Sequence, residues 1–457
     1  MWAIVGLSVG LLLVSARRAI PQGGPAEPFV APTLQALGKS PDLEEPLKAF
    51  RSGDVGTALQ GLRATVKNNP DLPPPQVILA AWLAEFNQPA MARSFLEQAV
   101  AESPDDPEAY LILADLAARE RKAAEANLLL AKANEVLSGT KISPKRTAIL
   151  KRRSLAGLAS MADARRDWKE AQKHLEALLA EDPKNAAALE QLGRVLFQLK
   201  KPEEALAKLQ EAAKLDPGIL APEATLAQLY QQAGDVKNAA KWILAAIEAR
   251  PKDAKVRRVA AQWSLEIRSL PQAEVQADAA VQLDPDSAAS QIVRGMVAMV
   301  RKDYKTAEDA LGKAHLLAPG NFAAISNLAL ALAEDDGAAK KPDAAVKKQD
   351  GDAKKRLALE YAQVLVRLFP DQPEAAATLG WTLYRLGRLE EAEASLRKAM
   401  SAGTASPETY YFFARVLADR GNKEGAKKLL EAALRMPPKG PFLWRADVEA
   451  LAKELTK

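Results

Sequence analysis

The chain has 457 residues, of which 48% are hydrophobic and 26% are charged, and it carries 63 Lys and Arg against 58 Asp and Glu. A net charge of +5 over so long a chain is weak support for binding to a nucleic acid. Cysteine is absent, which excludes disulfides, iron–sulfur clusters, thiolate zinc sites and the lipid-bearing cysteine of a bacterial lipoprotein.

Residues 1–20 are predicted to enter a membrane or a translocon. An uncharged apolar run from Trp2 to Ala16 is followed at once by Arg17 and Arg18. As a helix this run would span about 22 Å, which is short of the roughly 30 Å hydrocarbon core of a bilayer. It therefore fits a signal peptide of residues 1–16, with Val14-Ser15-Ala16 as the cleavage site. It also fits an uncleaved transmembrane anchor lengthened by the next apolar residues, with the arginines snorkelling. We favour the anchor; a buried N-terminal helix is the third alternative.

The side of the membrane on which the rest of the chain lies stays open. The two arginines after the span would keep the following residues in the cytoplasm under the positive-inside rule. The lack of cysteine and the candidate cleavage site instead suit export to the periplasm. Residues 21–38 follow as a predicted extended tether, because they are rich in proline and glycine (Pro21, Pro25, Pro28, Pro32, Gly23 and Gly24).

From residue 39 onward the chain repeats one pattern, which is clearest from Ala186 to Ile219. Leucines recur there at helical spacing in the first half, and apolar residues do so again in the second half, so two amphipathic helices are predicted. Pro202 suits the first turn of the second helix because it has no amide hydrogen to donate. Pro217 ends that helix, since the residue before a proline is pushed out of the α region.

This pattern returns in steps of 34 residues, with copies that begin at Ala186, Leu220, Ala254 and Ala288. Its twentieth position is alanine in every copy: Ala58, Ala92, Ala126, Ala171, Ala205, Ala239, Ala273, Ala307, Ala358, Ala392 and Ala426. Its thirty-second position is usually proline: Pro70, Pro104, Pro183, Pro217, Pro251, Pro285, Pro319, Pro370 and Pro438. Its eighth position is small, which lets the two helices approach closely because bulk there would overpack their crossing.

The pattern resembles the tetratricopeptide repeat, a helix–turn–helix unit with small residues at positions 8 and 20 and proline at position 32. The resemblance covers residues 39–440. It implies an all-α fold, a right-handed α-solenoid of about eleven units. Two family positions depart from the pattern: leucines such as Leu189 replace the usual aromatic residue at position 4 in most copies, and position 11 is tyrosine only at Tyr230.

Four stretches depart from the regular spacing. The first unit carries Glu44, Glu45 and Pro46 where its apolar stripe should be, which suits a polar end cap. A slip at 141–151 interrupts the spacing, which resumes at Arg152. An insertion at about 335–356 is rich in Lys, Asp, Ala and Gly, and we expect a loop of mixed charge there. In the tail, residues 441–457, apolar residues at helical spacing (Trp444, Val448, Leu451 and Leu455) predict a C-terminal capping helix.

Basic residues gather around the slip at 141–151. They form either a dock for an acidic partner or for anionic headgroups, or an ordinary solvated helix face. The candidate docking residues are Lys145, Arg146, Lys151, Arg152, Arg153, Arg165 and Arg166.

The resemblance also implies where a binding groove lies, because first-helix positions 2, 5, 9, 12 and 13 line the concave face in the family. The central units place mainly polar residues there: Arg194, Phe197, Gln198, Gln228, Gln231, Gln232, Lys255, Arg258 and Gln262. The C-terminal units place Met296, Met299, Trp381, Tyr384, Arg385, Tyr411 and Arg415 there, and exposed Met and aromatic residues would form an interaction patch. Alternatively, Trp381 and Tyr411 point into the next repeat and belong to the core.

The sequence holds no glycine-rich phosphate loop, no nucleophile elbow and no metal-spaced histidine motif. His174 and His315 lie in different units. We therefore expect no enzymatic activity, no cofactor and no metal.

The leading interpretation is a non-enzymatic interaction scaffold tethered to the membrane through residues 2–20. It would bind a peptide or helix of a membrane or envelope protein in its concave groove, to assemble an envelope complex of bacterial type. One alternative is a periplasmic factor for polysaccharide export or pilus biogenesis. Another is a binder of anionic polymers through residues 141–169. The sequence does not predict the oligomeric state.

Overall fold

The computed structural model describes residues 41–456, with gaps at 70, 87, 141, 337–343 and 437–440. All regular secondary structure in these ranges is helical. The predicted anchor or signal segment (1–20) and the predicted tether (21–38) lie outside the described residues. Among the helices that are described, none is both long and apolar enough to cross a lipid bilayer.

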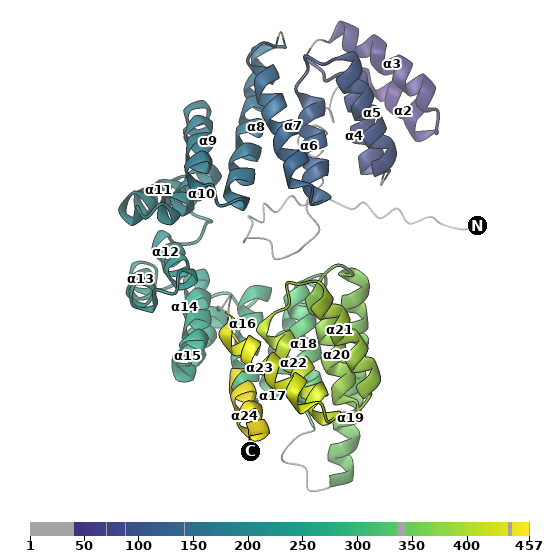
Figure 1. Cartoon of the computed structure of the whole chain (residues 1–457). Coiled ribbons are helices and arrows are strands. Elements are labelled where there is room, and N and C mark those ends of the chain that lie inside the picture. Colours follow the sequence, from purple (N-terminus) through teal and green to yellow (C-terminus); the bar gives the residue numbers. More distant parts are fainter. Residues whose placement is uncertain are drawn as a thin grey trace, which may run out of the picture. The chain divides into compact units, whose positions relative to one another are not determined.

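The described helices belong to two compact units (Figure 1). The first unit ends at Ile219 and contains η1 (Pro41–Leu43), α2 (Glu44–Arg51), α3 (Val55–Asn68), α4 (Pro75–Glu85), α5 (Pro89–Glu102), α6 (Glu108–Arg119), α7 (Ala123–Leu137), α8 (Pro144–Ala164), α9 (Trp168–Glu181), α10 (Ala186–Gln198) and α11 (Pro202–Leu215).

The second unit runs from Leu220 to the C-terminus. It contains α12 (Pro222–Gln232), α13 (Val236–Ala249), α14 (Ala254–Glu266), α15 (Leu270–Leu283), α16 (Ala288–Val300), α17 (Tyr304–Leu317), α18 (Phe322–Glu334), α19 (Ala344–Leu368), α20 (Pro373–Arg385), α21 (Leu389–Ser401), α22 (Pro407–Asp419), α23 (Lys423–Arg435) and α24 (Arg445–Thr456).

Successive helices pack in pairs, from α2 with α3 to α22 with α23, which makes eleven helical hairpins in the described part of the chain. Within each unit the second helix of a pair also contacts the first helix of the next, as α17 does with α18. The expected all-α array of about eleven helix–turn–helix units is confirmed, with α24 following the last pair.

Local sequence sets the ends of the helices. Asn185 caps α10, because its side-chain oxygen accepts a hydrogen bond from the amide of Ala188 at 3.0 Å and satisfies one free donor of the first turn. At the other end of a pair, Asp216 precedes Pro217 and has φ −137° and ψ 94°, outside the α region. The residues that recur every 34 positions and were predicted to end helices therefore do lie at helix boundaries.

The small positions of the repeat are where paired helices touch. All eleven alanines at the twentieth position are at most 1% exposed. A methyl group on Gly193 would lie 2.7 Å from Cγ of Leu209 and 3.0 Å from the backbone oxygen of Ala205. Such distances are below van der Waals contact, so the prediction of a close helix crossing at these positions is confirmed.

Residues 144–151 of the slip belong to an unusually long helix. Helix α8 has 21 residues, whereas α10 has 13. Ser143 caps its start by accepting a hydrogen bond from the amide of Arg146 at 3.3 Å. The extra residues lengthen the first helix of this pair, and its partner α9 keeps the usual length of 14 residues.

The expected loop at about 335–356 was wrong from Ala344 onward, because α19 begins there and continues to Leu368. The cause is twofold. Alanine, lysine and glutamine favour helix strongly, and Lys354 is fixed by Asp335 and Glu308, each with a carboxylate oxygen 2.6 Å from its Nζ. Gly351 allows the close approach, since a methyl group on it would lie 2.9 Å from the backbone of Asp336.

Candidate functional site

The second unit encloses a cavity of about 290 Å³, whose lining residues lie between Met299 and Asp447. Most of its wall comes from the C-terminal ends of first helices in consecutive pairs and from the turns that follow them. The remainder comes from the segment that leads into α24. The lining residues are Met299, Val300, Lys302, Tyr304, Glu334, Trp381, Tyr384, Arg385, Tyr411, Arg415, Leu443, Trp444, Ala446 and Asp447.

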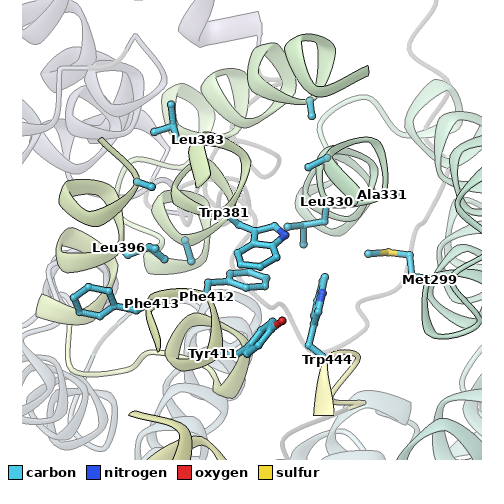
Figure 2. Packing of buried hydrophobic residues seen from close by; sticks show 14 of the residues in the cluster. Met299, Leu330, Ala331, Trp381, Leu383, Leu396, Tyr411, Phe412, Phe413 and Trp444 are labelled. Carbon is cyan, nitrogen blue, oxygen red and sulfur yellow. The ribbon is translucent and has the colours of Figure 1, made fainter. Parts of the chain in front are cut away.

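One wall of the cavity is a cluster of aromatic rings (Figure 2). Trp381 is stacked on Phe412 with ring centroids 4.5 Å apart, and on Tyr384 at 4.9 Å. Trp444 meets Phe412 edge to face at 5.0 Å, so the rings come from α20, from α22 and from the segment before α24. Offset and edge-to-face contacts add stability beyond the area they bury, which makes this wall stiff.

An ionic group formed by two half-buried side chains and an exposed one holds the second wall. Arg385 contacts Glu334 at 3.6 Å and Asp336 at 3.0 Å, and the indole N–H of Trp381 donates to Glu334 at 2.7 Å. Burial raises the pKa of Glu334, and the opposing effects of Arg385 and Trp381 do not cancel it. Burial acts to lower the pKa of Arg385, but its carboxylate neighbours outweigh this effect and raise it.

A third group of polar side chains lies at the mouth. The hydroxyl of Tyr384 donates to Asp419 at 2.6 Å and accepts from Nε of Arg415 at 3.0 Å. Burial, followed by the hydrogen bond to Asp419, raises the pKa of Tyr384, so this hydroxyl keeps its proton at neutral pH. The cavity thus offers aromatic faces beside fixed guanidinium and hydroxyl groups, an arrangement that suits side chains of a protein ligand.

Comparison with known families agrees with this architecture. Models of the tetratricopeptide repeat match residues 157–218 and 349–407, residues 196–262 and residues 407–439. The chain is a tetratricopeptide-repeat protein. Repeats of this family bind protein partners and are typically non-enzymatic, so the chain is a protein–protein interaction scaffold.

No curated protein matches the chain. Among solved structures it is similar to yeast Tom70, at 14% identity and a TM-score of 0.37, over 92% of this chain and 96% of that one. It is similar to pilF of Pseudomonas aeruginosa at 19% identity and a TM-score of 0.33, over 50% and 95%. It is also similar to PilW, a type IV pilus biogenesis factor, at 18% identity and a TM-score of 0.37, over 51% and 97%. Likenesses this remote say nothing about what this chain binds.

Several predicted groove residues of the tetratricopeptide array are buried rather than exposed. Trp381 is only 2% exposed, and Phe197, Met299 and Tyr411 are also buried. The expected exposure in the groove was therefore wrong for Phe197 and Met299, whereas the alternative position in the core is confirmed for Trp381 and Tyr411. First helices of neighbouring pairs pack against each other, so a large apolar side chain at these positions is covered by the next pair. Trp381 and Tyr411 form walls of the cavity from within the core.

The remaining C-terminal candidates are accessible in part. Tyr384, Arg385, Arg415 and Met296 are half-buried. The first three line the cavity, whereas Met296 packs beside the hydrophobic core. The cavity therefore brings together six of the seven residues predicted for these units, all except Met296: Met299, Trp381, Tyr384, Arg385, Tyr411 and Arg415.

The central candidates belong to different units. Arg194 and Gln198 lie on α10 of the first unit; Arg194 pairs with Glu190 at 2.9 Å, and Gln198 is exposed. The others lie on α12 and α14 of the second unit, where Gln232 is exposed and Gln228, Gln231, Lys255, Arg258 and Gln262 are half-buried. Arg258 donates to Ser290 at 3.2 Å, and burial lowers its pKa. These side chains are not among those that line the cavity.

The basic region around α8 is largely used within the fold. Arg146 is buried, and its guanidinium contacts Asp106 at 2.6 Å and Glu108 at 2.8 Å, so its assignment to a docking surface was wrong. Arg153 pairs with Asp115 at 2.6 Å and Lys151 with Glu181 at 2.7 Å. Arg165 donates to Asn127 at 2.7 Å, whereas Lys145, Arg165 and Arg166 are exposed and Arg152 is half-buried.

Sequence reasoning missed the contribution of the C-terminal segment to the cavity. Trp444 was predicted to belong to the cap, and it does pack against Phe412 in the core. It also lines the cavity together with Leu443, Ala446 and Asp447. One feature of the sequence could have indicated this contribution to the cavity. The tail combines an apolar stripe with acidic residues, and a simple cap does not require the acidic residues.

Proposed function

We propose that the chain is a membrane-tethered scaffold that captures a protein partner in the concave face of its second unit, in order to assemble an envelope complex of bacterial type. The observation that carries this proposal is the cavity of about 290 Å³ at the predicted groove positions, where aromatic rings and two arginines meet. Buried aromatic anchors beside arginine are the residues that contribute most to protein interfaces.

The membrane part of the proposal rests on the sequence. The uncharged run from Trp2 to Ala16 is followed by Arg17 and Arg18 and then by the proline-rich residues 21–38. An anchor of this kind with an extended spacer would hold the repeats away from the bilayer. Cleavage after Ala16 would instead release the repeats on the exported side, which suits the alternative role in polysaccharide export or pilus biogenesis.

The capture experiment compares two arginine variants that differ in position. Arg415 lines the cavity, whereas Arg435 lies on α23, is exposed and pairs with Glu431 of the same helix at 3.2 Å. Affinity purification from detergent-solubilised membranes, followed by quantitative mass spectrometry, should recover a protein with the native chain and with Arg435→Ala. The same protein should be depleted with Arg415→Ala.

Equal recovery with both variants would reject capture in the cavity. N-terminal sequencing of the mature chain decides between the anchor and the cleaved signal. A mature chain that starts after Ala16 would overturn the membrane tether.

A further inference from the structure

The C-terminal helix α24 contacts parts of the second unit that are far away in sequence. Asp447 accepts a hydrogen bond from Nζ of Lys302 at 2.9 Å, across 145 residues. Glu449 accepts from Nη2 of Arg268 at 2.5 Å, across 181 residues. Lys302 lies between α16 and α17, and Arg268 between α14 and α15 (Figure 1). Helix α24 therefore reaches from the last pair of the array to the turns of two much earlier pairs.

The apolar stripe of α24 and the acidic residues on either side of it have different partners. Trp444 just before the helix, with Val448 and Leu451 on it, belongs to the hydrophobic core of the C-terminal pairs. Asp447 and Glu449 lie on opposite sides of this apolar stripe, because residues two apart in a helix are about 200° apart, and each contacts a basic turn. A cap needs only the apolar face, since its purpose is to cover the exposed side of the last pair. The acidic contacts bring the helix across the cavity, whose lining includes both Asp447 and Lys302.

The basic turns occupy equivalent positions in the repeat. Arg268 and Lys302 are 34 residues apart and have φ values of 60° and 59°, a left-handed conformation that glycine adopts at lower cost. Glycine does stand at this position in other pairs, at Gly234 and Gly387. In the first unit the position is again basic, for example at Lys200. Positive charge at this position complements the negative end of the preceding helix, so a basic residue here is expected in either unit. The second unit differs because an acidic helix, α24, contacts these basic residues.

We propose that α24 is an intramolecular occupant of the groove and shows the chemistry of the partner that replaces it. The partner is an amphipathic helix that is preceded by an aromatic residue and carries carboxylates on either side of its apolar stripe, spaced as in Trp444, Asp447 and Glu449. This inference rests on the proposed function, because it names the ligand of the same cavity. It also makes α24 a competitor that keeps the groove closed until such a helix is present.

The polar contacts of α24 are of a kind that a competitor can replace. The side chains of Lys302 and Asp447 are 62% and 30% exposed, and those of Arg268 and Glu449 are 56% and 37% exposed. Exposed ion pairs contribute little because water and salt screen them. What favours α24 is the burial of its apolar side chains together with its covalent connection, which gives it a high effective concentration at the groove. A variant with weakened ion pairs should therefore admit a second helix of the same sequence.

The test uses the full chain and a fluorescent synthetic peptide of residues 441–457. Reversing both charges in the chain, by Asp447→Lys with Glu449→Lys, should make the native peptide bind at least about fivefold more tightly than it binds to the unaltered chain. The matched control is Lys453→Glu on the same helix, whose side chain is exposed. This control should leave the affinity unchanged. Fluorescence anisotropy gives each dissociation constant.

A charge exchange makes the result specific. The chain with Arg268→Glu and Lys302→Glu should prefer a peptide that carries Lys at positions 447 and 449 over the native peptide. Equal affinity of the native peptide for the unaltered and charge-reversed chains, or no binding to either, would overturn the proposal. A dimer of the unaltered chain that dissociates on charge reversal would also overturn it, because α24 would then belong to a second copy.

This outcome is separable from that of the capture experiment. Peptide binding without depletion of any protein by Arg415→Ala would leave the groove chemistry intact and reject capture at Arg415. Depletion without peptide binding would retain the scaffold function and reject α24 as the occupant.

Discussion

The crossing of α16 and α17 offers a direct test of the repeat packing, through two glycines of the same pair. A methyl group on Gly295 would lie 2.4 Å from Cγ and 2.7 Å from Cδ2 of Leu311. On Gly312 it would meet nothing within 4 Å. Both glycines are inside helices, so alanine gains about 1 kcal/mol of helix propensity at either position. Overpacking costs about 1 to 3 kcal/mol, and it applies only to Gly295.

We therefore expect Gly312→Ala to raise the free energy of unfolding by about 0.4 to 1 kcal/mol. The free energy of unfolding of Gly295→Ala should be about 1 to 3 kcal/mol lower than that of Gly312→Ala. Urea titrations followed by circular dichroism measure both. Because repeat arrays need not unfold in one step, hydrogen exchange of α16 and α17 should accompany the titrations. Leu311→Ala combined with Gly295→Ala should cost less than the sum of the two single changes, since the clash is removed. Equal stability of the two glycine variants would refute the close crossing.

Three further predictions concern buried groups. Arg146→Ala should lower the free energy of unfolding by about 3 to 5 kcal/mol, because two buried carboxylates lose their counterion. The control is Lys145→Ala, at the exposed neighbouring residue. Equal urea midpoints for the two variants would contradict a buried triad. Trp381→Ala should cost about 3 to 5 kcal/mol in the same assay, and a melt unchanged from that of the native chain would place this residue on the surface after all. Because the pKa of Glu334 is raised above its ordinary 4.5, the folded chain holds this proton more tightly than the unfolded chain. The stability that Glu334 contributes is therefore present below pH 4.5 and is lost as the pH rises through the folded pKa. Urea titrations at several pH values measure this contribution as the difference in free energy of unfolding between the native chain and Glu334→Gln. The difference should decline with rising pH. A difference that grows with pH would show that the attraction of Arg385 for the carboxylate dominates.

The repeating part of the fold could be predicted from the sequence because its causes are local and recur. Alanine at position 20 of each unit, such as Ala205, is needed wherever two helices cross closely, and proline at position 32 ends the second helix in the same place each time. Thirty-four-residue spacing carries both signals together. The segment from Ala344 was predicted incorrectly because composition alone was considered. Its alanines and lysines favour helix, and Lys354 finds carboxylates only after the chain has folded.

The candidate site was harder to predict, since it depends on how neighbouring pairs are placed. A first-helix side chain at a groove position faces both the concave side and the next first helix. The size of the side chain then decides whether it is buried or accessible. Trp381 is covered by Phe412 of the next pair, whereas Tyr384 and Arg415 reach the mouth of the cavity. The contact of α24 with Arg268 requires the curvature of several pairs to accumulate. No pattern within a single repeat contains that information.

The apolar face of α24 adds a requirement on any ligand that replaces it. Removing the helix would expose Trp444, Val448 and Leu451, which are buried in the core of the C-terminal pairs. Burying one such side chain is worth about 1.5 to 3 kcal/mol, whereas each exposed ion pair contributes about 0 to 1 kcal/mol. Carboxylates alone therefore cannot displace α24, although they could neutralise Lys302 and Arg268. A peptide of residues 441–457 with serine in place of the three apolar residues should fail to compete with the native peptide in the anisotropy assay. Competition by this acidic but non-amphipathic peptide would show that charge alone governs the groove.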